Sequence, residues 1–153
     1  MPAPVLVLAI GNPSRGDDAL GPLLAARLED AALPGVEVLV DFQLQIEHAL
    51  DLEGRDRVII VDASREAPPP FEWQRPAADA RTLHTTHALS PAALLGTAMR
   101  VGRALPPDVR VLAVRGDAFE LGAPLSDAAS RHLDAAWRAL DAACRETLGG
   151  LAA

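Results

Sequence analysis

The chain has 153 residues and a formal net charge of −7 at pH 7, and half of its residues are hydrophobic although only 3% are aromatic. This length is typical of one domain, so residues 1–153 are predicted to form a single domain with a core of Ala, Leu and Val. The acidic balance argues against a protein that binds nucleic-acid phosphates, which requires a basic face.

Four aliphatic runs are predicted to be strands. The apolar residues in them are continuous rather than alternating, which suits strands that are buried on both faces of a parallel sheet. The runs cover Val5–Ile10, Val36–Val40, Val58–Val61 and Val109–Val114.

Helical patterns lie between these runs. Apolar residues recur at helical spacing from Leu20 to Leu28, and a shorter pattern runs from Ile46 to Leu52. A Ser–Pro pair at residues 90–91 supplies the N-cap and first position of a helix over 92–104. Ser126 is expected to cap an Ala-rich helix that extends to about Leu148.

The segment 65–80 breaks this alternation because it is rich in proline, and Phe71 and Trp73 alternate within it as one short edge strand. The order of strands and helices elsewhere predicts an α/β fold, a three-layer sandwich with helices on both faces of the sheet.

The sequence also bears on location and redox chemistry. No apolar stretch approaches the ~20 residues of a membrane-spanning helix, and no basic region precedes the short N-terminal apolar run. The chain is therefore expected to be cytoplasmic. Cys144 is the only cysteine, which excludes an intramolecular disulfide and a cysteine metal cluster.

The most informative stretch is Gly11–Gly21, GNPSRGDDALG, which follows the first predicted strand. It places two adjacent carboxylates, Asp17 and Asp18, at the start of a helix. In α/β proteins ligands bind at this edge of the sheet. A plainer interpretation is that one of the two acids only caps the helix.

Asp62 directly follows the third predicted strand. Right-handed crossovers usually set the first and third strands of such a fold side by side, so Asp18 and Asp62 are expected within reach of one ion. Their joint placement at one edge favours a site over two separate caps.

Histidine is the candidate third ligand. His87 has the best placement because it lies just before the helix that Ser90 caps, whereas His48 is expected to be a surface or packing residue and His132 to be solvated. Two Asp and one His suit Zn, Ni, Co or Mn better than Mg or Ca. Three protein ligands leave coordination positions open, as in sites that act on a substrate.

Several other site types lack their sequence signatures. Neither nucleotide-binding fingerprint nor the Gly-x-Ser-x-Gly elbow of serine hydrolases is present. A phosphoacceptor receiver domain also uses paired acids after its first strand, but that class uses a lysine and this chain has none.

Taken together, the Gly11–Gly21 loop, the Val-Asp-Ala that closes the third strand at residues 61–63, and His87 resemble the [NiFe]-hydrogenase maturation endopeptidases. The similarity covers nearly the whole chain in order. It implies a three-layer α/β/α sandwich with a mostly parallel five-stranded sheet and one antiparallel strand, for which Phe71–Gln74 is the candidate.

The resemblance also implies an activity. These peptidases remove a C-terminal extension from the precursor of the hydrogenase large subunit after nickel insertion. Their three metal-contacting positions correspond to Asp18, Asp62 and His87, and the metal is the nickel of the substrate precursor, so no organic cofactor is implied.

The chain departs from the family pattern after the second strand. Many members carry a Gly-Gly-Thr-like turn there, whereas this chain has Asp-Phe-Gln-Leu-Gln at residues 41–45, a form most similar to the branch that serves soluble NAD-linked hydrogenases. This segment is expected to contact the precursor. The predicted substrate-binding residues of the chain are three from this segment, Asp41, Gln43 and Gln45, together with Asn12 of the first loop.

Two other functions remain open from the sequence: a non-catalytic chaperone that checks for nickel, and a small-molecule metallohydrolase. Cleavage of a precursor separates the peptidase from the chaperone. A permanently bound metal in the purified protein would indicate the metallohydrolase.

Overall fold

The computed structural model describes residues 2–79 and 89–148 of the chain. The elements in chain order are β1 (Val5–Ile10), the short 3₁₀ helix η1 (Gly16–Ala19), α1 (Leu20–Ala31), β2 (Val36–Asp41), α2 (His48–Asp51), β3 (Arg57–Ser64), β4 (Phe71–Gln74), α3 (Pro91–Arg100), β5 (Asp108–Arg115) and α4 (Asp127–Arg145).

The five strands form one sheet in the order β2-β1-β3-β5-β4. The first four strands in this order are parallel, and β4 pairs with β5 in the antiparallel direction. The predictions that β1 and β3 are neighbours and that Phe71–Gln74 is the antiparallel strand are therefore confirmed.

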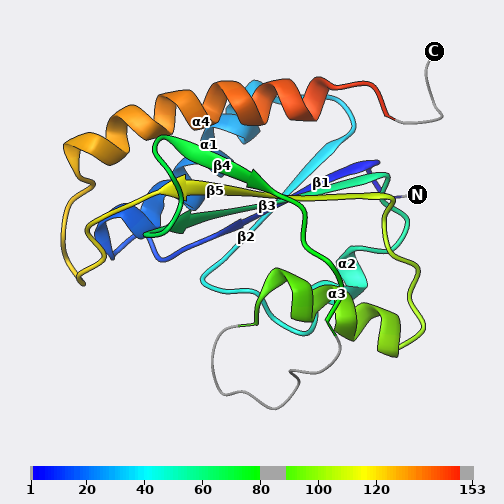
Figure 1. Cartoon of the computed structure of the whole chain (residues 1–153). Coiled ribbons are helices and arrows are strands. Elements are labelled where there is room, and N and C mark those ends of the chain that lie inside the picture. Colours follow the sequence, from blue (N-terminus) through cyan, green and yellow to red (C-terminus); the bar gives the residue numbers. More distant parts are fainter. Residues whose placement is uncertain (1, 80–88, 149–153) are drawn as a thin grey trace.

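Helices cover both faces of the sheet, which confirms the three-layer α/β/α sandwich (Figure 1). Helices α1 and α4 pack on one face over a core that contains Leu24, Ile59 and Leu140. The other face carries the shorter α2 and α3 over a core that contains Leu8, Ile60 and Leu94.

The ends of the elements differ from the sequence-based bounds. Strand β3 begins at Arg57 and continues through Asp62 to Ser64, because β5 supplies a parallel partner as far as Arg115. Helix α3 ends at Arg100, before Gly102 with its φ of 78°. Helix α2 is a single turn. The caps predicted at Ser90 and Ser126 are confirmed, since each hydroxyl accepts a hydrogen bond from the backbone N–H of the residue three positions later.

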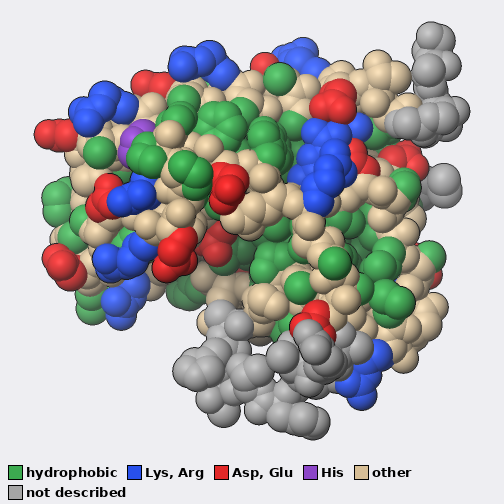
Figure 2. Space-filling model, viewed as in Figure 1, with side chains coloured by type: hydrophobic (Ala, Val, Ile, Leu, Met, Phe, Trp, Pro, Cys, Tyr) green, Lys and Arg blue, Asp and Glu red, His purple; other side chains and the backbone are tan. Residues whose placement is uncertain are grey.

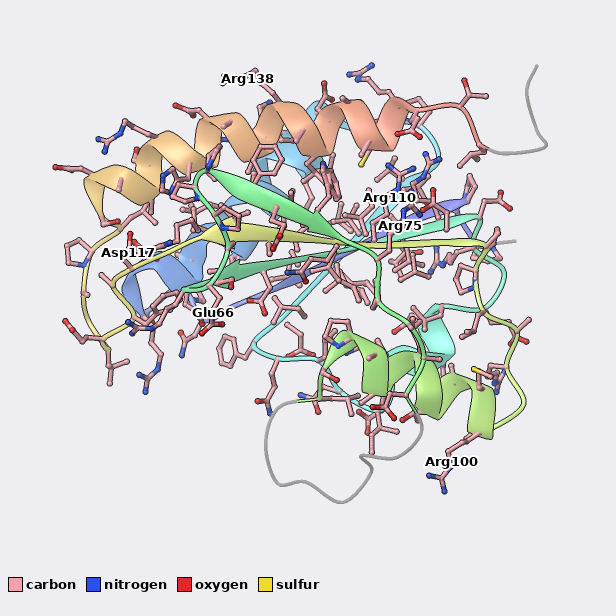
Figure 3. The ribbon with its side chains drawn as sticks, viewed as in Figure 1. Glu66, Arg75, Arg100, Arg110, Asp117 and Arg138 are labelled. Atoms are coloured by element: carbon pink, nitrogen blue, oxygen red, sulfur yellow. The ribbon has the colours of Figure 1, made fainter. Side chains whose placement is uncertain are left out.

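The amino ends of the parallel strands form a neutralised edge. Asp108, the first residue of β5, pairs with the buried Arg57 at 2.7 Å, with Arg110 at 2.8 Å and with Arg75 at 3.2 Å. Figure 2 shows basic and acidic side chains clustered over this end of the sheet, where Arg75 and Arg110 are labelled in Figure 3. Because the carboxylate of Asp108 is paired with arginines, we interpret this edge as stabilising the fold and not as a binding site.

No helix in the described ranges is long and apolar enough to cross a membrane.

Candidate active site

The candidate site lies at the carboxyl ends of β1, β2 and β3. Ile10, the last residue of β1, pairs with Asp41 at the end of β2, and the preceding Ala9 pairs with Val61 of β3. Asp62 is therefore one residue further along β3, level with this edge. It lies two residues beyond Ile60, which packs in the core under α2 and α3, so the alternation of a strand turns its side chain toward that face.

The loop after β1 folds tightly against the strand that precedes it. A Cβ added at Gly11, whose φ is 151°, would meet the carbonyl oxygen of Asp18, and one added at Gly21 would meet the carbonyl oxygen of Ile10. Only glycine permits both approaches. Close packing of this kind fixes the loop, and with it Asp18, at the strand end.

Asp18 is held by the loop itself. Its Oδ2 accepts a 2.7 Å hydrogen bond from the backbone N–H of Asn12, and the Asn12 side-chain oxygen in turn accepts one of 2.9 Å from the N–H of Ser14. Neither Asp17 nor Asp18 caps a helix through its side chain, because neither η1 nor α1 has a side-chain cap. The helix-cap interpretation of these acids is therefore wrong.

Asp17 has a different role from its neighbour. Its completely buried carboxylate accepts hydrogen bonds from the N–H groups of Asp117, Ala118 and Ser126 and from the Ser126 hydroxyl, at 2.8 to 3.1 Å. Burial alone would raise the pKa of Asp17, but these hydrogen bonds outweigh it and hold the pKa below its ordinary value. Asp17 thus fastens the loop to the β5–α4 connection.

The partners of Asp17 were not expected from the sequence. Gly116 completes the arrangement, because a Cβ at that position would lie 2.9 Å from the Cβ of Asp17. Nothing in the spacing of residues links position 17 to positions 116–126. Ser126 carries the one local signal, its cap motif, and that motif explains only its bond to Ala129.

Asp62 is the electrostatically perturbed group of the site. Burial raises its pKa to about 7, the negative charge of Asp18 contributes in the same direction, and a hydrogen bond with the Ala63 backbone opposes them. The two acids therefore interact across the strand ends. Among the described residues, neither Asp18 nor Asp62 forms an ion pair with an arginine.

The segment after β2 borders the same edge. The backbone carbonyl of Asp41 accepts a 3.0 Å hydrogen bond from the N–H of Gly11, which joins it to the loop. The Asp41 carboxylate accepts a 2.7 Å bond from the Phe42 N–H and lies 3.5 Å from Nε2 of His48. His48 is buried and accepts a bond from the Gln45 N–H, in agreement with its expected packing role.

An open pocket of about 230 Å³ adjoins Asp62. Its lining includes Gln43 from the segment after β2, Ser64 of β3 and Gln74 of β4. Of the predicted substrate-binding residues, Gln43 therefore shares a pocket with Asp62, whereas Gln45 is exposed and does not line it. The side chains of Ser64 and Gln74 were not expected here from the sequence.

His87, the predicted third ligand, lies outside the described residues, as does His84. Within the described ranges no three His, Cys, Asp or Glu side chains converge on a point that could hold a metal ion. The prediction that His132 is solvated is wrong: the residue is half-buried, and its Nδ1 lies 3.0 Å from the Arg115 carbonyl oxygen.

The arrangement can bind positive charge or hold a proton. A cation near both carboxylates would remove the repulsion between them, and in its absence Asp62 retains a proton close to neutral pH. Perturbed carboxylates in a cleft at the strand ends of an α/β sheet are typical of a functional site.

Neither a scan of protein-family models nor a search of curated proteins finds a match to the chain. Solved structures do match it. Hydrogenase maturating endopeptidase HybD from E. coli is 25% identical over 95% of this chain and 93% of its own, with a TM-score of 0.73. A hydrogenase 2 maturation peptidase from a Thaumarchaeota archaeon is also 25% identical, over 97% of this chain and 99% of its own, with a TM-score of 0.65.

At lower identity, the [NiFe] hydrogenase maturation protease HycI from Thermococcus kodakarensis KOD1 shares the fold. It is 19% identical over 94% of each chain, with a TM-score of 0.71. The resemblance indicated by the sequence motifs is thus confirmed by structures that match this chain along nearly its whole length.

The raised pKa of Asp62 predicts a pH-dependent cost in stability. Below pH 3.8 Asp62 is protonated in both the folded and the unfolded chain, and its shifted pKa does not change stability. Between pH 3.8 and about 7 only the unfolded chain loses this proton, so the free energy of unfolding falls across this interval and stays lowered above it. Replacing the side chain by a neutral amide removes the cost. Asp62→Asn is expected to be more stable than the parent chain by up to about 4 kcal/mol at pH 8, with the difference vanishing near pH 4.

Urea unfolding at the two pH values measures this difference. Glu29→Gln, which neutralises an exposed carboxylate on α1, is the matched control and is expected to show little change at either pH. A gain for Asp62→Asn that is equal at pH 4 and pH 8 would contradict the assignment.

Proposed function

We propose that this chain, a peptidase with the fold and site motifs of the hydrogenase maturation endopeptidases, removes the C-terminal extension of a nickel-loaded [NiFe]-hydrogenase large-subunit precursor. One observation carries the proposal. Asp18 and Asp62 meet at the carboxyl edge of the sheet with no arginine partner among the described residues, on a fold that matches these peptidases nearly end to end.

In this proposal the metal belongs to the substrate. Asp18 and Asp62 contact the nickel of the precursor, and His87 supplies the third ligand. Burial raises the pKa of Asp62 and the charge of Asp18 adds to the shift; a divalent cation between the two carboxylates compensates both, so binding of a nickel-loaded precursor is favoured over an empty one. Such a site distinguishes a precursor that holds nickel from one that does not before the peptide bond is cut.

The chemistry is hydrolysis of one peptide bond. Water adds to the carbonyl carbon, the carbon–nitrogen bond breaks, and the amine of the extension leaves with a proton. Nickel promotes this step as a Lewis acid, by polarising the carbonyl oxygen or by lowering the pKa of the attacking water. The fixed loop contributes orientation, because Asn12 and the two glycines leave Asp18 little freedom to move.

Asn12, Asp41, Gln43 and Gln45 contact the precursor around the metal. The apolar neighbours of the two glutamines support this role: Phe42 is 66% exposed and Ile46 is 60% exposed. Large apolar side chains held in solvent beside a site mark a surface that a protein partner covers. The segment 41–46 is therefore proposed as the precursor-docking segment.

Processing of a purified, nickel-loaded large-subunit precursor tests the function. The variants Asp18→Ala, Asp62→Ala and His87→Ala are each expected to lower the cleavage rate by at least about 100-fold, because each removes a contact to the metal. The control is Glu66→Ala, which removes an exposed carboxylate at the same end of the sheet (Figure 3) and should cut at the parent rate.

Near-normal cutting by all three variants would exclude the metal-contact assignment. Binding of the precursor by the parent chain with no shortening would instead indicate a nickel-checking chaperone. A metal that copurifies with the chain in the absence of precursor would indicate a small-molecule metallohydrolase.

Exchange of residues 42–45 within the docking segment tests whether this segment selects the precursor that is cut. Replacing residues 42–45 by Gly-Gly-Thr-Ala removes Phe42 and both glutamines from the surface and is expected to change which precursor is cut. Competition between two nickel-loaded precursors of different hydrogenases, followed by mass spectrometry of the products, measures this selectivity. An unchanged product ratio would reject a docking role for the segment.

A further inference from the structure

We propose that the pocket beside Asp62 is a side-chain subsite that binds an aliphatic side chain of a residue flanking the scissile bond. This inference rests on the proposed peptidase function. It adds a recognition element that is separate from the metal, and it names the chemical class of the substrate side chain.

The floor of the pocket is apolar. Most of it is formed by strand residues that face the α2 and α3 side of the sheet and by residues close to the helices there, whereas Ala63 packs against the core on the α1 and α4 side. The apolar lining consists of Ile10, Leu44, Ile60, Ala63, Leu89, Pro91, Val111 and Ala113. Ala113 is central, because its partners in the sheet are Asp62 on one side and Glu72 of β4 on the other.

The size of the pocket fits one side chain. A buried apolar cavity of about 150 Å³ is large enough to bind benzene, so about 230 Å³ accommodates a branched aliphatic side chain with room to enter. Ala113 and Ala63 are the smallest side chains of the apolar lining, and Ala113 is the direct partner of Asp62 in the sheet, so a larger side chain at position 113 would take up space beside Asp62. Filling the pocket with an apolar group removes water from apolar surface, which is favourable at about 25 cal/mol per Å².

The rim of the pocket is polar. Gln43 and Gln74 are exposed and lie on opposite borders, one following β2 and the other on β4. The Gln74 side chain donates to Glu72, and its carbonyl oxygen has no partner in the part of the chain that the structure describes. The Ser64 hydroxyl accepts from the Glu66 N–H and keeps its own proton to donate. A polar rim around an apolar floor suits a peptide whose backbone crosses the rim and whose side chain enters the pocket.

Position connects this pocket to the reaction. Asp62 belongs both to the pocket lining and to the carboxylate pair of the site. An extended peptide advances only ~3.3–3.6 Å per residue, so a side chain seated beside Asp62 comes from a residue that adjoins the bond at the metal. A residue farther along the extension lies beyond the pocket.

The experiment varies the substrate and the pocket together. Nickel-loaded large-subunit precursors are prepared with Ala, Leu, Phe or Asp at the residue before the scissile bond, and separately at the residue after it. The parent chain is expected to cut the Leu precursor at least about 10-fold faster than the Asp precursor at one of the two positions.

Two substitutions of the same residue then shift the preference in opposite directions. Ala113→Leu narrows the pocket and is expected to slow cutting of the Leu precursor about 10-fold or more, with the Ala precursor changed less than about threefold. Ala113→Gly enlarges the pocket and is expected to raise the rate for Phe relative to Leu. If Ala113→Leu does not fold, as judged by circular dichroism, the Gly variant decides.

The outcomes distinguish a failure of the proposed subsite from a failure of the proposed peptidase function. An order of substrate preference that neither variant alters at either position overturns the subsite, even when all the precursors are cut. No cutting of any precursor by the parent chain overturns the peptidase function itself.

Discussion

The geometry of the site depends on one buried carboxylate, Asp17. It receives four hydrogen bonds from three residues that lie 100 or more positions away in sequence: Asp117 and Ala118, which follow β5, and Ser126, the N-cap of α4. A buried, ionised carboxylate is tolerated only when its hydrogen bonds are satisfied in this way. Because Asp18 is the next residue, the anchor for Asp17 also fixes where Asp18 stands relative to β3.

The two edges of the sheet treat acidic side chains in opposite ways. At the amino edge Asp108 pairs with three arginines, and hydrogen bonds from two of them, Arg110 and Arg57, outweigh its burial and hold its pKa at about 2. At the carboxyl edge burial, and after it the negative charge of Asp18, raises the pKa of Asp62 to about 7. The first arrangement stabilises the folded chain, whereas the second costs free energy, which the proposed binding of the substrate's nickel would recover. Such a cost, confined to one edge, is what a functional site is expected to carry.

Much of the fold and part of the site follow from the sequence, for physical reasons. Continuous aliphatic runs identified the parallel strands, and the handedness of crossovers placed β1 beside β3, which brought Asp18 and Asp62 together. The contacts of Asp17 and the pocket at Ala113 were not predicted, because both depend on how loops from distant parts of the chain pack, and no local pattern records that. The place of His87 stays a prediction, since it lies outside the described residues.

Nickel K-edge X-ray absorption of the precursor tests the central claim most directly, that Asp18 and Asp62 contact the substrate's metal. Spectra are compared for the nickel-loaded precursor alone, with the parent chain in a rapidly frozen complex, and with the Asp18→Ala, Asp62→Ala double variant. The account predicts more oxygen or nitrogen ligands on nickel with the parent chain than with the double variant, which retains only His87 of the three proposed ligands. A nickel environment that is unchanged when the parent chain is bound would contradict it.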